Sequence, residues 1–215
     1  MSYINPNIFQ EDFANLTGWT DSDSNGAVSE IDPAGQLHLD CRDIPSGVGY
    51  GKRSKDIGTI GDGDYYAELK FEGDVWDATG GTANGIRVSI NAATNFLQAT
   101  IRGDSSGNNG IYLYDGATEP KIYSHDWDND WHTIVFYVHN SQTDVDIWID
   151  KDPATEAADV TDADCSAGAW AADGFTDLYG YGSEAGNGEY HIDYIYVGDA
   201  LGEDTANATF FGSNF

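Results

Sequence analysis

The chain has 215 residues, a length typical of one all-β domain, and we treat residues 1–215 as a single domain with short tails. It carries 37 Asp and Glu residues against 9 Lys and Arg, for a formal net charge of -28. Such a surface repels nucleic acid and anionic membranes, and no apolar run reaches the length of a membrane span. We therefore expect neither binding to nucleic acid nor insertion into a membrane.

Short segments in which apolar and polar residues alternate recur along the chain, separated by clusters of Gly, Asp, Asn and Ser. This alternation is typical of strands that bury one face. The predicted strands are residues 37–41, 65–71, 86–90, 97–102, 111–114, 131–139, 144–150 and 190–197. The third and fourth of these predict a hairpin, as do the sixth and seventh. Residues 151–174 are rich in Ala and Asp and predict a long loop or a short helix.

Three parts of the chain resemble one known superfamily. Residues 9–13 (F-Q-E-D-F), with G-W-T at 18–20, are similar to the opening of many concanavalin A-like, or laminin-G-like, sandwiches. W-H-T-I-V-F at 131–136 and V-D-I-W-I-D at 145–150 resemble their central hairpin, and residues 191–197 resemble their closing strand. The resemblance implies an all-β fold, a two-sheet antiparallel sandwich of the jelly-roll kind with one concave sheet. It does not imply one function, because the superfamily holds lectins, glycosidases, polysaccharide lyases and virion proteins.

The polar residues of the middle strands alternate with core residues, so we expect them to share the outward face of one sheet. Aromatic rings bury the apolar face of a sugar, and planar polar side chains bind its hydroxyl groups. These residue types predict a carbohydrate-binding face on the concave sheet. Its predicted members are Arg87, Gln98, Arg102, Tyr112, Tyr114, Tyr137, His139 and Trp148. The alternative interpretation is an ordinary solvated face with cross-strand aromatic pairs.

Trp148 is the predicted centre of this face. It stands between Ile147 and Ile149, so it faces away from a core that holds both. We expect a sugar or a neighbouring protein to cover its indole, and we expect Trp148→Ala to leave the domain stable.

Two enzyme classes of the superfamily give weaker matches. Retaining glucanases carry acids in an E-x-D-x-x-E strand, whereas here Glu30 and Asp32 are followed by Pro33 and the third acid is absent. A polysaccharide lyase needs a base and neutralising groups, for which His139, Tyr137, Arg87 and Gln98 are suitable. The denser lyase motifs of the superfamily are not found, so lectin-like binding is the main hypothesis and a lyase or an atypical glycosidase is the alternative.

The loop of residues 21–32 fits the pattern D-x-D-x-N-G-x5-D, which is close to that of calcium loops. The predicted calcium ligands are Asp21, Asp23, Asn25 and Asp32. The alternative is a hairpin rich in turn formers, since the many acidic residues can equally serve solubility or life in high salt.

The first residues lack a basic segment followed by an apolar one, so no secretory signal is predicted. Together with the absence of a catalytic motif, this favours display on a virion surface or outside the cell, with virion or filament subunits as neighbours. A third hypothesis is a purely structural subunit whose Phe-rich end, residues 209–215, docks onto a partner. Cys41 and Cys165 leave a disulfide or two buried thiols as alternatives.

Overall fold

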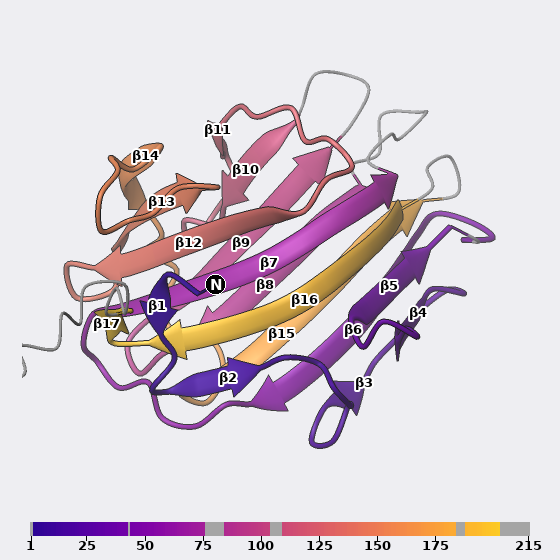
Figure 1. Cartoon of the computed structure of the whole chain (residues 1–215), viewed down its shortest axis with the longest axis horizontal. Coiled ribbons are helices and arrows are strands. Elements are labelled where there is room, and N and C mark those ends of the chain that lie inside the picture. Colours follow the sequence, from indigo (N-terminus) through magenta and orange to yellow (C-terminus); the bar gives the residue numbers. More distant parts are fainter. Residues whose placement is uncertain (1, 43, 76–83, 104–108, 184–187, 203–215) are drawn as a thin grey trace, which may run out of the picture.

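Two antiparallel sheets pack face to face in the computed structural model, which describes residues 2–42, 44–75, 84–103, 109–183 and 188–202 (Figure 1). In spatial order, the front sheet consists of β14 (Val160–Asp164), β13 (Asp144–Ile149), β12 (His132–His139), β7 (Tyr65–Val75), β16 (Gly188–Gly198), β5 (Leu37–Cys41) and β4 (Val28–Ile31), and β2 (Phe9–Glu11) also pairs with β16. The back sheet consists of β11 (Lys121–Tyr123), β10 (Gly110–Leu113), β9 (Phe96–Gly103), β8 (Asn84–Asn91), β15 (Phe175–Ser183), β6 (Val48–Asp56) and β3 (Thr20–Asp21). The described residues contain no helix, and so none that could cross a membrane.

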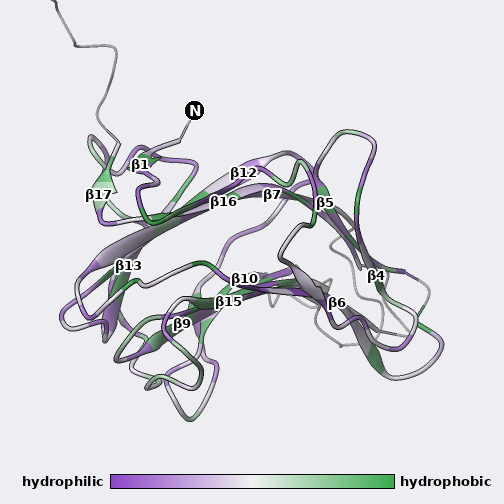
Figure 2. Cartoon of the chain, turned by 90° about the horizontal axis from the view of Figure 1, so that it is seen from below, coloured by the Kyte–Doolittle hydropathy of each residue, from purple (hydrophilic) through white to green (hydrophobic). Residues whose placement is uncertain are grey.

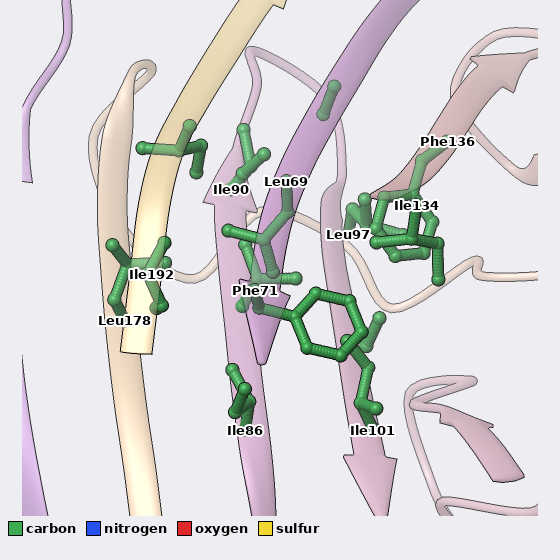
Figure 3. Close-up of a cluster of buried hydrophobic side chains, with 14 of the residues drawn as sticks. Leu69, Phe71, Ile86, Ile90, Leu97, Ile101, Ile134, Phe136, Leu178 and Ile192 are labelled. Carbon is green, nitrogen blue, oxygen red and sulfur yellow. The ribbon is translucent and has the colours of Figure 1, made fainter. Parts of the chain in front are cut away.

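The core lies between the two sheets (Figure 3). Alternate residues of each strand point into it, and most of them are fully buried aliphatic or aromatic side chains. The front sheet contributes Leu69, Phe71, Ile134, Phe136 and Ile192, and the back sheet contributes Ile86, Ile90, Leu97, Ile101 and Leu178. Each such side chain stabilises the fold by about 1.5–3 kcal/mol relative to an exposed one. The polar residues between them must therefore point outward from their own sheet.

The predicted all-β sandwich is confirmed, and each predicted strand coincides with a strand of the structure. The two predicted hairpins are formed by β8 with β9 and by β12 with β13. Residues 151–174 are mostly loop, as one of the two predicted alternatives has it, but they also contain strand β14, which was not predicted.

Strands β6 and β15 pair with each other in the back sheet, and the residue pattern predicted neither of them. Glycines occupy inward positions in both. A Cβ atom on Gly180 would lie 2.7 Å from the Cβ of Leu39, and one on Gly51 would lie 2.8 Å from the carbonyl oxygen of Val28. The facing strands approach so closely at these positions that only glycine fits, and the apolar alternation that identifies a strand is lost.

The structure corrects the prediction of one shared polar face. Strands β8, β9 and β10 belong to the back sheet, whereas β12 and β13 belong to the front sheet. Alternation shows which side of a strand faces the core, but it does not show which sheet the strand joins. The predicted binding residues therefore lie on two opposite outer faces of the sandwich. Arg87, Gln98, Arg102, Tyr112 and Tyr114 belong to the back sheet and its edge, and Tyr137, His139 and Trp148 belong to the front sheet.

A two-stranded ribbon lies on the outside of the front sheet (Figure 2). It is formed by β1 (Ile4–Asn5) and β17 (Ala200–Leu201), which join the two ends of the described chain. The ribbon is held against the sheet by an apolar cluster that contains Ile4, Val135, Trp148, Tyr194 and Tyr196.

Trp148 faces away from the core between the sheets, as predicted, but the expectation that it is exposed is wrong. Only 8% of its surface is accessible, because the ribbon covers its ring. Its indole N–H donates a hydrogen bond of 3.0 Å to the carbonyl oxygen of Glu156. The chain itself covers this indole, and neither a sugar nor a neighbouring protein is needed to do so.

Cys41 and Cys165 are two separate buried thiols and do not form a disulfide. Burial raises the pKa of each thiol to about 12, so both are protonated at neutral pH. The Phe-rich segment predicted to dock onto a partner, residues 209–215, lies outside the described residues.

Candidate functional site

Outward side chains of five neighbouring strands, with Glu119 from a loop, form an aromatic and charged surface on the back sheet, which we call the tyrosine-arginine face. Its members are Tyr50, Lys52, Arg87, Thr100, Arg102, Tyr112, Glu119, Asp177, Tyr179 and Tyr181. One row of direct cross-strand partners runs straight across the sheet, in the order Lys52, Tyr179, Arg87, Thr100 and Tyr112. Because the hydrogen-bonded backbone sets these positions, the row is prearranged and needs no ordering on binding.

Aromatic rings and cations alternate along this face. The rings of Tyr179 and Tyr181 are stacked, with centroids 5.4 Å apart and an angle of 13° between planes. Tyr50 presents an edge to Tyr179 at 5.7 Å. The guanidinium of Arg87 lies 4.9 Å from the ring centroid of Tyr181, and that of Arg102 lies 4.1 Å from the centroid of Tyr112. These cation–π contacts fix each guanidinium beside a tyrosine ring.

Two carboxylates neutralise the cations. Glu119, in the loop between β10 and β11, accepts hydrogen bonds from Arg87 at 3.2 Å and from the hydroxyl of Thr100 at 2.6 Å, and it also pairs with Arg102. Asp177, whose side chain is completely buried, pairs with Lys52 at 3.1 Å. With three cations and two carboxylates, the face has a small local excess of positive charge on a chain whose net charge is -28.

Protonation at this face is set by burial and by the Lys52 contacts. Burial lowers the pKa of Lys52, but hydrogen bonds with Tyr179 and Asp177 outweigh it and the pKa lies above its ordinary value. Burial raises the pKa of Tyr179 and of Tyr181, despite the nearby cations. At neutral pH the face therefore presents neutral phenol hydroxyls beside charged ammonium and guanidinium groups.

The residues predicted to bind carbohydrate are divided between the tyrosine-arginine face and the outer face of the front sheet. Arg87, Arg102 and Tyr112 are members of it, and Gln98 and Tyr114 lie at the next cross-strand row. On the front sheet, Tyr137 stacks on Tyr66 and His139, with centroids 4.5 and 4.9 Å away.

The four residues predicted to form a lyase site do not share one face. Tyr137 and His139 lie on the opposite side of the sandwich from Arg87 and Gln98. Tyr137 and His139 contact carboxylates of their own sheet face: the Tyr137 hydroxyl donates to Asp64 at 3.0 Å, and His139 lies 3.3 Å from Asp146.

Half of the members of the tyrosine-arginine face were not predicted from the sequence, because strands β6 and β15, which carry them, were not predicted. The pattern Y-G-Y-G at residues 179–182 and Y-G-K at 50–52 carries the signal. Tyrosine alternates there with glycine, so the outward residues become visible once glycine is accepted as an inward residue. Lys52 belongs to β6, which lies between β15 and β3 in the sheet.

No protein-family model matches the sequence, and a comparison with curated proteins gives no match. Solved structures do match. A β-1,3-glucanase from Mycobacterium marinum superposes with a TM-score of 0.63 at 14% identity, covering 90% of this chain and 99% of the glucanase. A carbohydrate esterase from the Shiga toxin-encoding bacteriophage phi24B gives 0.61 at 16% identity, over 88% and 96% of the two chains. A Lotus tetragonolobus seed lectin gives 0.60 at 7% identity, over 91% and 99%.

The chain has a concanavalin A-like fold. The resemblance inferred from the opening, central and closing segments is thereby confirmed. At such low identities the similarity describes the fold, and lectins and enzymes share it. The chemistry of this concanavalin A-like sandwich has to be argued from its own side chains.

The predicted calcium ligands contact different partners in this concanavalin A-like sandwich. Asp21 pairs with Arg53 at 3.2 Å, and Asn25 donates to the carbonyl oxygen of Val48 at 3.3 Å. Asp32 accepts hydrogen bonds from the backbone N–H groups of Ala34 and Gln36, at 2.8 and 2.9 Å.

Asp23 closes the loop, accepting hydrogen bonds from the backbone N–H of Ser29 at 2.7 Å and of Lys52 at 2.8 Å. Calcium binding by this loop stays a prediction.

The Asp23→Ala variant distinguishes a loop that is held by hydrogen bonds alone from a loop that binds calcium. The lost hydrogen bonds to Ser29 and Lys52 are expected to lower the free energy of unfolding by about 1–3 kcal/mol, equally with and without a chelator. Asp193→Ala, which removes an ion pair with Lys70 that is one-third exposed, is the control and is expected to cost less than about 1 kcal/mol. Scanning calorimetry measures both. A chelator that lowers the melting temperature of the unmodified protein, but not that of Asp23→Ala, would establish the calcium site instead, because bound metal stabilises only the folded state.

Proposed function

We propose that the protein is a lectin-like carbohydrate-binding module and that the tyrosine-arginine face is its binding site. The observation that carries the proposal is the row of Lys52, Tyr179, Arg87, Thr100 and Tyr112, which places rings, cations and a hydroxyl side by side on a rigid sheet. Rings of this kind cover the apolar face of a sugar, and forked polar groups bind its hydroxyls. The similarity of the fold to a seed lectin, a β-1,3-glucanase and a phage carbohydrate esterase supports a carbohydrate ligand.

A neutral glycan fits the charges best. Glu119 and Asp177 already neutralise most of the positive charge of the face, and the net charge of -28 repels an acidic polysaccharide as it approaches. The Arg87 and Arg102 side chains keep 24% of their surface accessible, enough for their N–H groups to reach sugar hydroxyls. Glu119, held between them, offers an acceptor to the same hydroxyls.

The ion pairs of Glu119 and Asp177 favour carbohydrate binding over hydrolysis. A glycosidase needs one carboxyl group that donates a proton and a second that acts as base or nucleophile. Glu119 is paired with Arg87 and Arg102, and Asp177 is paired with Lys52, so both carboxyl groups are already engaged by cations. An acid for the leaving group is missing from the part of this face that the structure describes.

Titration calorimetry with neutral oligosaccharides chosen from a glycan array tests the proposal. Arg87→Ala removes charged hydrogen bonds, each worth about 1.5–3 kcal/mol, and is expected to weaken binding about 10- to 150-fold. Tyr181→Ala is expected to weaken binding too, because the ring and its Arg87 contact are lost. Tyr137→Ala is the matched control, since it removes a stacked tyrosine from the other outer face.

Two results would contradict the assignment. Loss of binding in Tyr137→Ala but not in Tyr181→Ala would move the site to the front sheet. Appearance of an unsaturated product, followed by its absorbance, would make the protein a lyase.

We further propose that the module is displayed outside the cell, on a virion surface as a capsid decoration or tail protein beside neighbouring subunits. The similarity to a phage-encoded carbohydrate esterase supports this location. Mass spectrometry of purified particles tests it, and a chain absent from particles would contradict it. A chain present in particles that binds no glycan would favour the purely structural subunit.

A further inference from the structure

A second cluster of functional groups lies on the outer face of the front sheet, opposite the tyrosine-arginine face. It is built on β5 and β16, which run side by side (Figure 1). His38 and His191 are direct cross-strand partners, and their rings are stacked with centroids 4.6 Å apart and an angle of 11°. Glu189 precedes His191 by two residues and so points to the same side. Ligand atoms of these three residues all lie within 4.8 Å of one another.

Neighbouring side chains orient the three groups as metal ligands are usually oriented. The Nδ1 atom of His191 lies 3.1 Å from the carboxylate of Asp32, which can only accept, so Nδ1 is the donor of this pair. A carboxylate behind a histidine fixes its tautomer and raises its basicity in many metal sites.

Glu189 is oriented from the other side by Arg42. The guanidinium of Arg42 pairs with Oε2 of Glu189 at 2.7 Å, which leaves Oε1 directed at Nε2 of His38, 3.0 Å away. The side chains of His38, Glu189 and His191 are 13–14% accessible, so they are shielded from bulk water but reach the surface.

The charge of the cluster favours a cation. Four carboxyl groups surround the two imidazoles, and Arg42 balances one of them; the four belong to Glu30, Asp32, Asp40 and Glu189. The surplus of negative charge raises the local concentration of cations.

We propose that His38, Glu189 and His191 bind a divalent transition metal, with zinc as the metal that this ligand set fits best. Zinc takes imidazole nitrogen at about 2.0–2.1 Å and carboxylate oxygen at about 2.0–2.2 Å, in a tetrahedron. Three protein ligands leave the fourth position open to water or to a ligand from outside. Calcium and magnesium prefer oxygen ligands alone, so two imidazoles select against them. Tetrahedral bonds of about 2 Å require ligand atoms about 3.3 Å apart, which small side-chain rotations provide.

Calorimetric titration of the full, chelator-treated chain with zinc chloride tests the site. We expect saturable zinc binding that calcium and magnesium do not displace. His38→Ala and His191→Ala each remove a ligand and are expected to weaken it at least about 100-fold. Asp32→Asn keeps all three ligands and is expected to weaken it about 10- to 100-fold, the usual effect of losing the group behind a histidine ligand.

His139→Ala is the matched control. This histidine also stands among carboxylates of the front sheet, near Asp146 and Asp162, but it is the single imidazole of its cluster. Zinc binding that is retained in His38→Ala and His191→Ala, or that is lost in His139→Ala, would overturn the proposal. Circular dichroism checks that each variant is folded, and His38→Gln replaces His38→Ala if the alanine variant is not.

X-ray absorption separates the site from the two buried thiols. Cys41 belongs to β5 but points into the interior, where its thiol donates to the carbonyl oxygen of Gly180 at 3.1 Å. We expect only nitrogen and oxygen in the first shell of bound zinc, and sulfur in that shell would overturn the assignment. Because the glycan face is on the other sheet, failure of either proposal leaves the other intact.

Discussion

Replacing Trp148 with alanine is expected to lower the free energy of unfolding by about 3–5 kcal/mol, the usual range for a buried aromatic side chain. The indole is 8% accessible and belongs to the apolar cluster, with Ile4 and Val135, that holds the β1–β17 ribbon on the sheet. Its loss leaves a cavity and deprives the carbonyl oxygen of Glu156 of its donor. For a chain of this size the melting temperature should fall by roughly 6–20 °C, which urea and thermal unfolding both measure.

Trp170→Ala is the matched control for this experiment. The same substitution is made there on an indole that is 52% accessible, and it is expected to cost less than about 1 kcal/mol. Glycan binding by folded Trp148→Ala should be unchanged, since Trp148 belongs to the front sheet. If Trp148→Ala is no more destabilising than Trp170→Ala, the ribbon does not cover the front sheet in solution.

Replacing Glu68 with alanine is expected to release the ribbon. Glu68 is completely buried, and its carboxylate accepts hydrogen bonds from the backbone N–H groups of Tyr3 and Ile4 at 2.8 and 3.1 Å and from the hydroxyls of Ser2 and Tyr194 at 3.0 and 2.6 Å. These bonds tie the start of the chain to the middle of the front sheet. Because hydrogen bonds to a charged group contribute about 1.5–3 kcal/mol, we expect a loss of at least about 2 kcal/mol.

Hydrogen exchange locates this effect. Amide exchange at residues 2–5 and 200–202 should accelerate in Glu68→Ala while exchange in β8 and β9 stays slow, since those strands belong to the other sheet. Asp193→Ala is the control, because its ion pair with Lys70 is one-third exposed and contributes at most about 1 kcal/mol.

The stability losses caused by Trp148→Ala and Glu68→Ala should also be non-additive. Both act through the packing of Ile4 on the sheet, so the double variant is expected to lose less stability than the sum of the single ones. Full additivity would argue that Glu68 and Trp148 act independently of the ribbon.

The sequence by itself determined the fold class and the side of each strong strand that enters the core. Alternation around Ile147 and Ile149, or Ile86 and Val88, depends only on the local geometry of a strand, in which successive side chains point to opposite sides. It therefore predicted the strands and that Arg87 and Trp148 point away from the core. The hairpins β8–β9 and β12–β13 were predicted for the same reason, because their partners are adjacent in sequence.

Only the tertiary structure decided which strands share a sheet and what covers each outward side chain. Pairing of β15 with β6 and β8 joins segments far apart in the chain, and glycines such as Gly180 hide its inward face. That pairing puts Tyr179 beside Arg87, and the pairing of β5 with β16 puts His38 beside His191. The ribbon over Trp148 is likewise made by the two ends of the described chain. Contacts of this kind depend on how distant segments pack together, and a local pattern carries no information about them.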